Sequence, residues 1–218
     1  MRRIGAAMIA SVMAALLALN MAEAQAQDRP LKIVALGDSL TAGFGLPAGE
    51  AFPVKLAAAL KAKGIAVEIV NAGVSGDTAS GGLERLDWAV PEDTQAVILE
   101  LGANDGLRGI DPKITRKAVD AMVKKLTDRH IPILICGMLA PPNLGSDYGA
   151  KFNSIFPDLA KQYGALLYPF FLTGVVGDET LNQRDGLHPT AKGVDVIVAK
   201  ILPSVEQLIA RAKTQRGS

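Results

Sequence analysis

The chain contains little of several residue types, and each scarcity excludes a class of protein. Its 218 residues include one cysteine and two histidines. A single cysteine cannot form an internal disulfide, even in an oxidising compartment. Neither sign of charge dominates, since 23 Lys and Arg stand against 22 Asp and Glu. This balance gives no electrostatic reason to expect nucleic acid as a partner.

Three common catalytic motifs are also missing. Gly-x-Ser-x-Gly does not occur, so the chain is not an ordinary α/β-hydrolase. His-Glu-x-x-His does not occur, and the two histidines are far apart, so we expect no metal site. No Gly-x-Gly-x-x-Gly follows a predicted strand, which excludes the usual dinucleotide-binding site. We therefore expect an activity that needs neither a metal nor a cofactor.

The longest apolar run is short and lies at the N-terminus. Two arginines precede the run Ile4–Leu19, and small-x-small patterns then end at Ala24 and at Ala26. The run falls short of the ~20 residues that a membrane span needs. We predict a signal peptide over residues 1–26, cut near Ala24 or Ala26, and a mature protein that is periplasmic or secreted and has no membrane span. An uncleaved anchor is the alternative.

The rest of the chain alternates short apolar runs with longer amphipathic segments. The runs predict strands at 31–36, 66–70, 95–101, 131–137 and 165–168. The amphipathic segments predict helices at 52–63, 112–129, 147–163 and 190–213, with Pro203 kinking or splitting the last. Strands with no polar alternation are typical of parallel sheets covered on both faces. We predict one α/β domain over residues 27–213 and a frayed tail over 214–218.

Reactive residue types follow these predicted strands. In open α/β sheets, ligands bind beyond the carboxyl ends of the strands. Ser39 follows the first strand, Gly76 the second and Asn104 the third, while Asp185 and His188 come after the fifth. The topology therefore predicts that all five residues meet at one edge of the sheet.

His188 is the preferred general base for a serine nucleophile, which needs a base that titrates near neutrality. The other histidine, His130, precedes the fourth predicted strand, on the wrong side of the sheet, and is predicted to be a surface residue. Asp185 lies three residues before His188, so its carboxylate can accept a hydrogen bond from Nδ1. That bond leaves Nε2 free to take the proton of Ser39.

An oxyanion hole needs donors aimed at charge that develops in the transition state. The candidates are the backbone N–H groups of Ser39 and Gly76 and the side-chain amide of Asn104. Apolar residues that follow strand ends are candidates for an acyl groove, with core packing as the alternative for several of them. They are Phe44, Leu107, Met138, Leu139, Leu144 and Tyr148.

These motifs together resemble the SGNH (GDSL) hydrolase superfamily, named for its Ser, Gly, Asn and His. Four blocks appear in the family's order, and together they are a specific signal. They lie at Ala35–Thr41, at Gly76, at Gly102–Asp105 and at Asp185 and His188. Within the superfamily, the chain is similar to the bacterial periplasmic thioesterase/lysophospholipase and arylesterase group.

The resemblance implies a flavodoxin-like three-layer α/β/α sandwich with a five-stranded parallel sheet of order 2-1-3-4-5. It also implies hydrolysis of aryl esters, short-to-medium acyl esters, lysophospholipids or acyl thioesters through an acyl-enzyme on Ser39. Two alternatives stay open. One is a carbohydrate O-acetyl esterase of the same superfamily, against which the 5% aromatic content argues mildly. The other is a non-catalytic binding module with this fold.

Overall fold

The computed structural model describes residues 30–216 and places five strands in one parallel sheet. The sheet order is β2-β1-β3-β4-β5, which confirms the predicted order. The predicted signal peptide and residues 217–218 of the predicted tail lie outside the described residues. The strands are β1 (Leu31–Gly37), β2 (Val67–Gly73), β3 (Ala96–Glu100), β4 (Ile133–Cys136) and β5 (Leu166–Tyr168).

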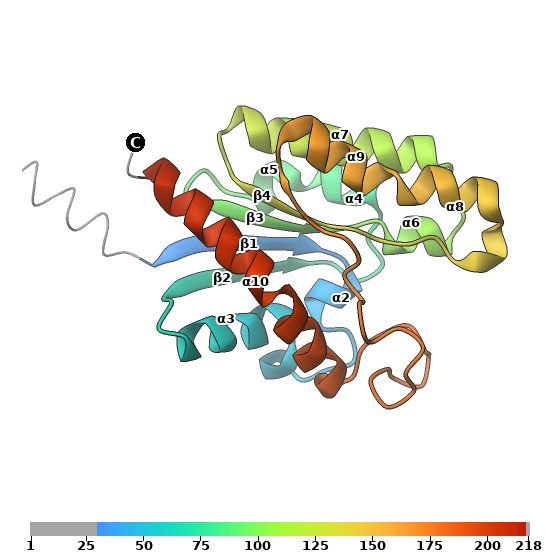
Figure 1. The fold of residues 1–218 in the computed structure, drawn as a ribbon, viewed down its shortest axis with the longest axis horizontal. Coiled ribbons are helices and arrows are strands. Elements are labelled where there is room, and N and C mark those ends of the chain that lie inside the picture. Colours follow the sequence, from blue (N-terminus) through green and yellow to red (C-terminus); the bar gives the residue numbers. More distant parts are fainter. Residues whose placement is uncertain (1–29, 217–218) are drawn as a thin grey trace, which may run out of the picture. The chain divides into compact units, whose positions relative to one another are not determined.

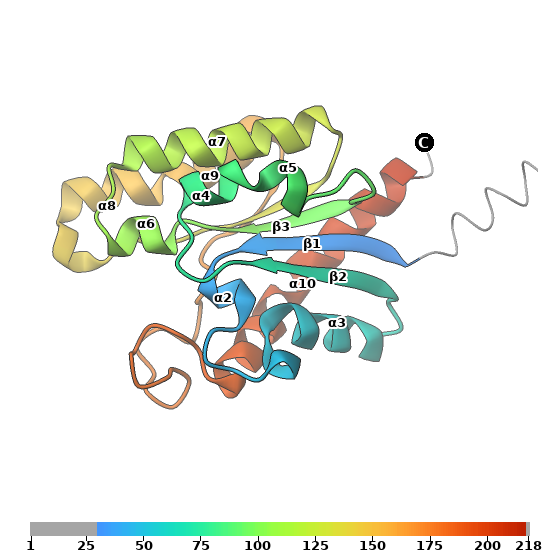
Figure 2. The ribbon, with the colours of Figure 1, turned by 180° about the vertical axis from the view of Figure 1, so that it is seen from behind.

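Helices cover both faces of the sheet, as the two opposite views in Figures 1 and 2 show. On one face, α3 (Phe52–Ala62) and α10 (Ala191–Arg216) pack against each other. The other face carries α4 (Ala79–Glu84), α5 (Leu86–Ala89), α7 (Pro112–Asp128) and α9 (Ile155–Tyr163). The remaining short helices are α2 (Ser39–Ala42), η1 (Ala48–Glu50), α6 (Ala103–Leu107), η2 (Pro142–Leu144) and α8 (Ser146–Asn153).

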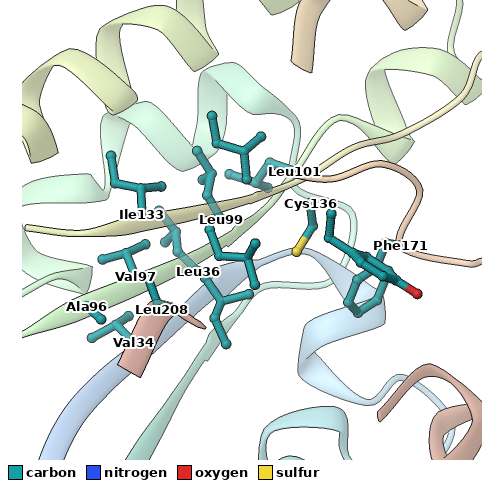
Figure 3. Packing of buried hydrophobic residues seen from close by; sticks show 14 of the residues in the cluster. Val34, Leu36, Ala96, Val97, Leu99, Leu101, Ile133, Cys136, Phe171 and Leu208 are labelled. Carbon is teal, nitrogen blue, oxygen red and sulfur yellow. The ribbon is translucent and has the colours of Figure 1, made fainter. Parts of the chain in front are cut away.

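The central strands are apolar because helices cover both of their faces. Every residue of β3 and of β4 is buried, whereas the edge strand β2 is only half-buried or exposed. Figure 3 shows Leu36, Leu99 and Ile133 in the resulting core, with Cys136 among them. Burial raises the pKa of the Cys136 thiol well above its usual range, so this cysteine is an inert core residue.

Two predicted helices differ from the observed ones. The segment predicted as one helix over 147–163 is divided at Ser154 into α8 and α9. Pro157 explains the break, because it lacks the N–H for an i→i−4 bond and its ring clashes with the preceding turn. The last helix, in contrast, is not split at Pro203 and continues to Arg216, so residues 214–216 are helical rather than a frayed tail.

The last helix tolerates Pro203 because apolar residues on both sides of it are buried. Ile201 and Val205 are both fully buried in the core. The free energy of burying such side chains is about 1.5–3 kcal/mol each, which offsets the hydrogen bond that proline removes. Separately, no helix within residues 30–216 is both long and apolar enough to cross a bilayer.

Candidate active site

Three side chains from two distant segments meet at the carboxyl edge of the sheet. Ser39 is the first residue of α2, directly beyond β1, while Asp185 and His188 lie in the loop between β5 and α10. The Ser39 Oγ lies 2.9 Å from His188 Nε2. The His188 Nδ1 lies 2.6 Å from Asp185 Oδ2. A hydroxyl, an imidazole and a carboxylate in this order can activate the hydroxyl as a nucleophile.

The turn that carries His188 is closed by the carboxylate of Asp185. Its Oδ1 accepts the backbone N–H groups of Leu187, at 2.9 Å, and of His188, at 3.0 Å. These bonds, with that of His188 the stronger influence, lower the pKa of Asp185 to about 2. Asp185 is therefore ionised at neutral pH and favours the His188 tautomer with its proton on Nδ1.

The nucleophile's neighbour, Asp38, is a buried N-cap. Its Oδ1 accepts the backbone N–H of Leu40 at 3.0 Å, and its Oδ2 accepts the side-chain amide of Asn104 at 3.1 Å. Burial raises the pKa of Asp38 to about 6, while both hydrogen bonds act in the opposite direction. Asp38 therefore holds a negative charge at neutral pH, directly next to Ser39.

A second buried carboxyl, Glu100, lies beneath this loop at the end of β3. Its Oε2 accepts the Thr41 hydroxyl at 2.6 Å and the Asp38 backbone N–H at 3.3 Å. Burial, and then the charge of Asp38, raise the pKa of Glu100 well above its usual range. Two adjacent buried carboxyls do not ionise together, so Glu100 keeps its proton while Asp38 is charged.

The predicted oxyanion donors stand on the loops that follow β2 and β3. Gly76 has φ +83°, a left-handed conformation that favours glycine. Asn104 lies in α6, and Arg108 caps the end of that helix. The Arg108 guanidinium reaches both loops, because its Nη2 lies 2.9 Å from the Gly76 carbonyl oxygen and 3.4 Å from Asn104 Oδ1. The structure therefore brings Gly76 and Asn104 to one point at the edge of the sheet.

Behind the site, Arg85 ties the ends of β1 and β2 together. Its side chain is buried and pairs with Asp77 at 2.6 Å. It also donates to the carbonyl oxygens of Ala72 and Gly37, both at 2.8 Å. Asp105 plays a similar role for the next loop, since it accepts the backbone N–H of Ala79 at 2.8 Å.

The six residues predicted for an acyl groove fall into different environments. Phe44 is exposed, and its ring centroid lies 4.6 Å from that of His188. Leu107 and Leu139 are exposed, while Leu144 and Tyr148 are half-buried. The Tyr148 hydroxyl donates to the carbonyl oxygen of Ile110 at 2.8 Å, on the segment after α6. Met138 is only 3% exposed and belongs to the hydrophobic core, which corresponds to the core-packing alternative.

The remaining histidine lies away from this site. His130 is exposed in the turn before β4 and has φ 56°, as expected for a surface residue in a tight turn. Within residues 30–216, no cluster of three or more His, Cys, Asp or Glu side chains is arranged to hold a metal ion.

Sequence reasoning assigned no role to Arg85, Glu100, Arg108 or the loop residue Gln183. Each contacts a backbone or side-chain group that is distant in sequence or sits on another loop. Arg108 follows the Asn104 motif closely in sequence, and Gln183 closely precedes the His188 motif. That proximity was the one sequence feature that could have indicated a role for them at the site. Arg85 carried no signal that separates it from an ordinary surface residue. Glu100 did carry one, because a carboxyl group at the end of a buried apolar strand needs polar partners.

A parallel α/β sheet with a serine after β1, hydrogen-bonded to a histidine that contacts a carboxylate, is the arrangement of a serine hydrolase. The chain belongs to the GDSL-like Lipase/Acylhydrolase family, whose model matches residues 35–196. It is 34% identical to esterase TesA of Pseudomonas aeruginosa, over 93% of this chain and 100% of the relative.

Two further comparisons agree with this assignment. The chain is 33% identical to thioesterase 1/protease 1/lysophospholipase L1 of Escherichia coli (strain K12), over 81% of this chain and 84% of the relative. The solved structure of AlinE4, an SGNH-hydrolase family esterase, is 45% identical, with a TM-score of 0.70 over 82% of this chain and 96% of that chain. The protein is a carboxylic ester hydrolase, and the non-catalytic alternative is wrong.

Proposed function

We propose that the protein hydrolyses carboxylic esters through an acyl-enzyme on Ser39, with His188 as the general base and Asp185 as its orienting group. One observation carries this proposal. The hydroxyl, the imidazole and the carboxylate form a continuous hydrogen-bonded series with separations of 2.9 Å and 2.6 Å. These distances allow a proton to pass from Ser39 Oγ to Nε2 without movement of a loop.

The reaction proceeds in two halves. Ser39 Oγ attacks the acyl carbonyl carbon while His188 Nε2 takes its proton, and the leaving alcohol or thiol then receives that proton. Water attacks the acyl-serine next and gives a proton to the same nitrogen. That proton passes to Ser39 Oγ as the bond between Oγ and the acyl carbon breaks, and the free acid departs. The backbone N–H groups of Ser39 and Gly76 and the Asn104 amide stabilise the oxyanion in both halves.

The substrates that we propose are aryl esters, short-to-medium acyl esters, lysophospholipids and acyl thioesters. An exposed Phe44 beside the imidazole supports an acyl or aryl group at that point. Leu107, Leu139, Leu144 and Tyr148 are the remaining proposed contacts for the acyl chain. The names esterase, thioesterase and lysophospholipase among the relatives support the same substrate classes.

We also propose that residues 1–26 direct export and are removed near Ala24 or Ala26. The mature enzyme, residues 27–213 with its terminal extension, then acts in the periplasm or outside the cell. Mass spectrometry of the protein recovered from cell fractions tests both statements, because it gives the new N-terminus and the compartment together.

The catalytic assignment is tested by labelling with a fluorophosphonate and by turnover of p-nitrophenyl butyrate. Ser39→Ala removes the nucleophile, so we expect no labelling and a fall in kcat on the order of 10⁶-fold. Asn104→Ala removes one donor and should lower kcat by roughly 10²–10³-fold. Ser154→Ala is the control, because that hydroxyl donates only to the carbonyl oxygen of Lys151. Equal, mild effects of Ser39→Ala and Asn104→Ala would contradict the assigned roles.

The substrate class is tested separately, on the mature protein. A substrate panel separates the proposed acyl esterase from a carbohydrate O-acetyl esterase. It consists of p-nitrophenyl esters of increasing chain length, a lysophospholipid, an acyl thioester and acetylated xylan. Turnover restricted to acetylated xylan would overturn the proposed substrate class and leave the Ser39 mechanism intact.

A further inference from the structure

The loop that carries His188 has few ties to the segment that carries Ser39. We call residues 169–190 the base loop and residues 38–51 the nucleophile segment. Within residues 30–216, two hydrogen bonds join them. One is the bond between His188 and Ser39 itself, and the other runs from the Gln183 side chain to the Phe44 carbonyl oxygen.

Gln183 is built into the turn that presents His188. Its backbone N–H donates to the carbonyl oxygen of His188 at 2.7 Å, and its carbonyl oxygen accepts the N–H of Gly186 at 2.9 Å. The next pair outward, Asn182 and Pro189, forms an antiparallel bridge. The strand-like pairing therefore fixes Gln183 directly opposite His188.

The side-chain amide of Gln183 connects the two segments. Its Nε2 donates to the carbonyl oxygen of Phe44 at 2.7 Å and to that of Pro189 at 3.0 Å. A glutamine amide has two N–H groups, so both are used. Phe44 in turn lays its ring against the imidazole of His188, with centroids 4.6 Å apart. Gln183 thus binds the backbone of Pro189, which follows the general base in sequence, and the backbone of Phe44, whose ring contacts the base.

The residue after Phe44 shows how closely the segments fit. Gly45 has φ +74°, and a Cβ at this position would lie 2.3 Å from Gln183 Oε1. No side chain fits there unless the amide moves. The close approach is an observation independent of the hydrogen bonds, and it shows that the chain passes tightly over Gln183.

We propose that Gln183 is a positioning residue that holds the imidazole of His188 in register with the Ser39 hydroxyl, by bracing the base loop against the nucleophile segment at Phe44. This inference rests on the proposed role of His188 as the general base. Asp185 and Leu187, at the tip of the turn, are exposed, so no packed neighbour holds the turn from that side. A shift of about 1 Å between reacting groups can lower the rate on the order of 10²-fold.

The test is Gln183→Met, which preserves length and removes both N–H groups. We expect kcat for p-nitrophenyl butyrate to fall about tenfold to a hundredfold. The KM should stay within about twofold, because a misplaced base slows the chemical step without removing ground-state contacts. The rate of fluorophosphonate labelling should fall by the same factor as kcat. Gln162→Met is the matched control, since that exposed glutamine lies on α9 and donates to Asp120 at 3.4 Å.

A second variant approaches the same contact from the other side. Gly45→Ala places a methyl group against the Gln183 amide and should lower kcat in the same way. Gly64→Ala controls for backbone strain, because Gly64 has φ +76° and nothing within 4 Å of its added Cβ. This pair keeps the proposal testable even if Gln183→Met does not fold.

A purely structural role is separated by a double-mutant cycle. If Gln183 acts through the general base, adding Gln183→Met to His188→Ala should leave the residual activity unchanged. A general loss of folded enzyme would instead lower activity in both backgrounds, the wild type and His188→Ala. Wild-type kcat in Gln183→Met and Gly45→Ala, alongside an inactive His188→Ala, would overturn the inference and leave the proposed function standing. An active His188→Ala would instead overturn the proposed function.

Discussion

The side-chain amide of Asn104 donates to the buried carboxylate of Asp38, with 3.1 Å between Nδ2 and Oδ2. Arg108 approaches the other end of the same amide, 3.4 Å from Oδ1. An ionised carboxylate only accepts hydrogen bonds and a guanidinium only donates them, so these neighbours determine which way the amide faces. One N–H of Asn104 remains for the oxygen of a substrate.

Asp38→Asn should therefore lower activity although the variant is nearly isosteric. The amide oxygen of an asparagine can replace only one of the two carboxylate oxygens, which accept from Leu40 and Asn104. We expect kcat to fall about 10²-fold, as for a lost oxyanion donor, with KM nearly unchanged. Steady-state kinetics with p-nitrophenyl butyrate measure both. Asp111→Asn is the control, because Asp111 caps α7 with the same bond to a backbone N–H two residues on. Unchanged kcat would show that Asp38 does not orient Asn104.

The same residue should give stability a specific pH dependence. Burial raises the pKa of Asp38 from 3.8 to about 6, so between these values the folded protein binds more protons than the unfolded chain. Stability from this group is fully present below pH ~4 and is lost as the pH rises through 6, by about 3 kcal/mol. Asp38→Asn lacks this loss, so its free energy of unfolding should rise relative to that of the wild type between pH 4 and 7. Urea unfolding at both values measures the gap, and a constant gap would contradict the prediction.

Much of the fold and of the site can be predicted from local sequence patterns, whereas short helices and contacts between distant residues cannot. The apolar runs of β3 and β4 and the position of Ser39 after β1 are visible in sequence, because strand burial and strand-end placement are short-range properties. Helix α6 was missed, since Ala103–Leu107 is too short to show helical periodicity. Glu100 looked like the end of an apolar strand, and only the folded sheet places it under Asp38.

Gly76→Ala should separate backbone strain from steric conflict. The φ of +83° costs about 1–2 kcal/mol for a residue with a Cβ, whereas the added atom would meet only Arg108 Nη2, at 3.7 Å. We expect a loss of stability of that size together with a fall in kcat, because relief of the strain turns the Gly76 N–H away from the substrate. Gly164→Ala, at φ +64° with open space around it, should lose similar stability and keep its kcat. Equal kinetics for the two variants would argue against Gly76 as an oxyanion donor.

Asp185→Asn should lower kcat by about 10²–10⁴-fold at neutral pH, because an amide can favour the wrong tautomer of His188.

The pKa of Asp185 is lowered from 3.8 to about 2, chiefly by the backbone N–H of His188. Its contribution to stability is thus present above pH ~4 and lost as the pH falls through 2. The stability advantage of the wild type over Asp185→Asn should shrink on acidification from pH 4 to 2, in thermal unfolding followed by circular dichroism. An advantage that grows over that range would refute the assigned direction of the shift.

Arg108 offers the sharpest test of whether the two loop donors act as one unit. Its Nη2 lies 2.9 Å from the Gly76 carbonyl oxygen and 3.4 Å from Asn104 Oδ1, so one cation spans both. Arg108→Met should lower kcat about tenfold, the equivalent of one hydrogen bond to a charged group, while the exposed position keeps the fold intact. Arg211→Met is the matched control, since Arg211 also donates to a glycine carbonyl oxygen, that of Gly164, at the opposite edge of the sheet.

The Arg108 effect should also depend on Asn104. In an Asn104→Ala background, Arg108→Met can act only through Gly76, so its effect on kcat should be smaller than in the wild type. Kinetics of the two single variants and the double variant give this coupling directly. Full additivity would mean that the guanidinium acts independently of the amide, through its contact with Gly76, and that the Asn104 orientation depends on Asp38 without help from Arg108.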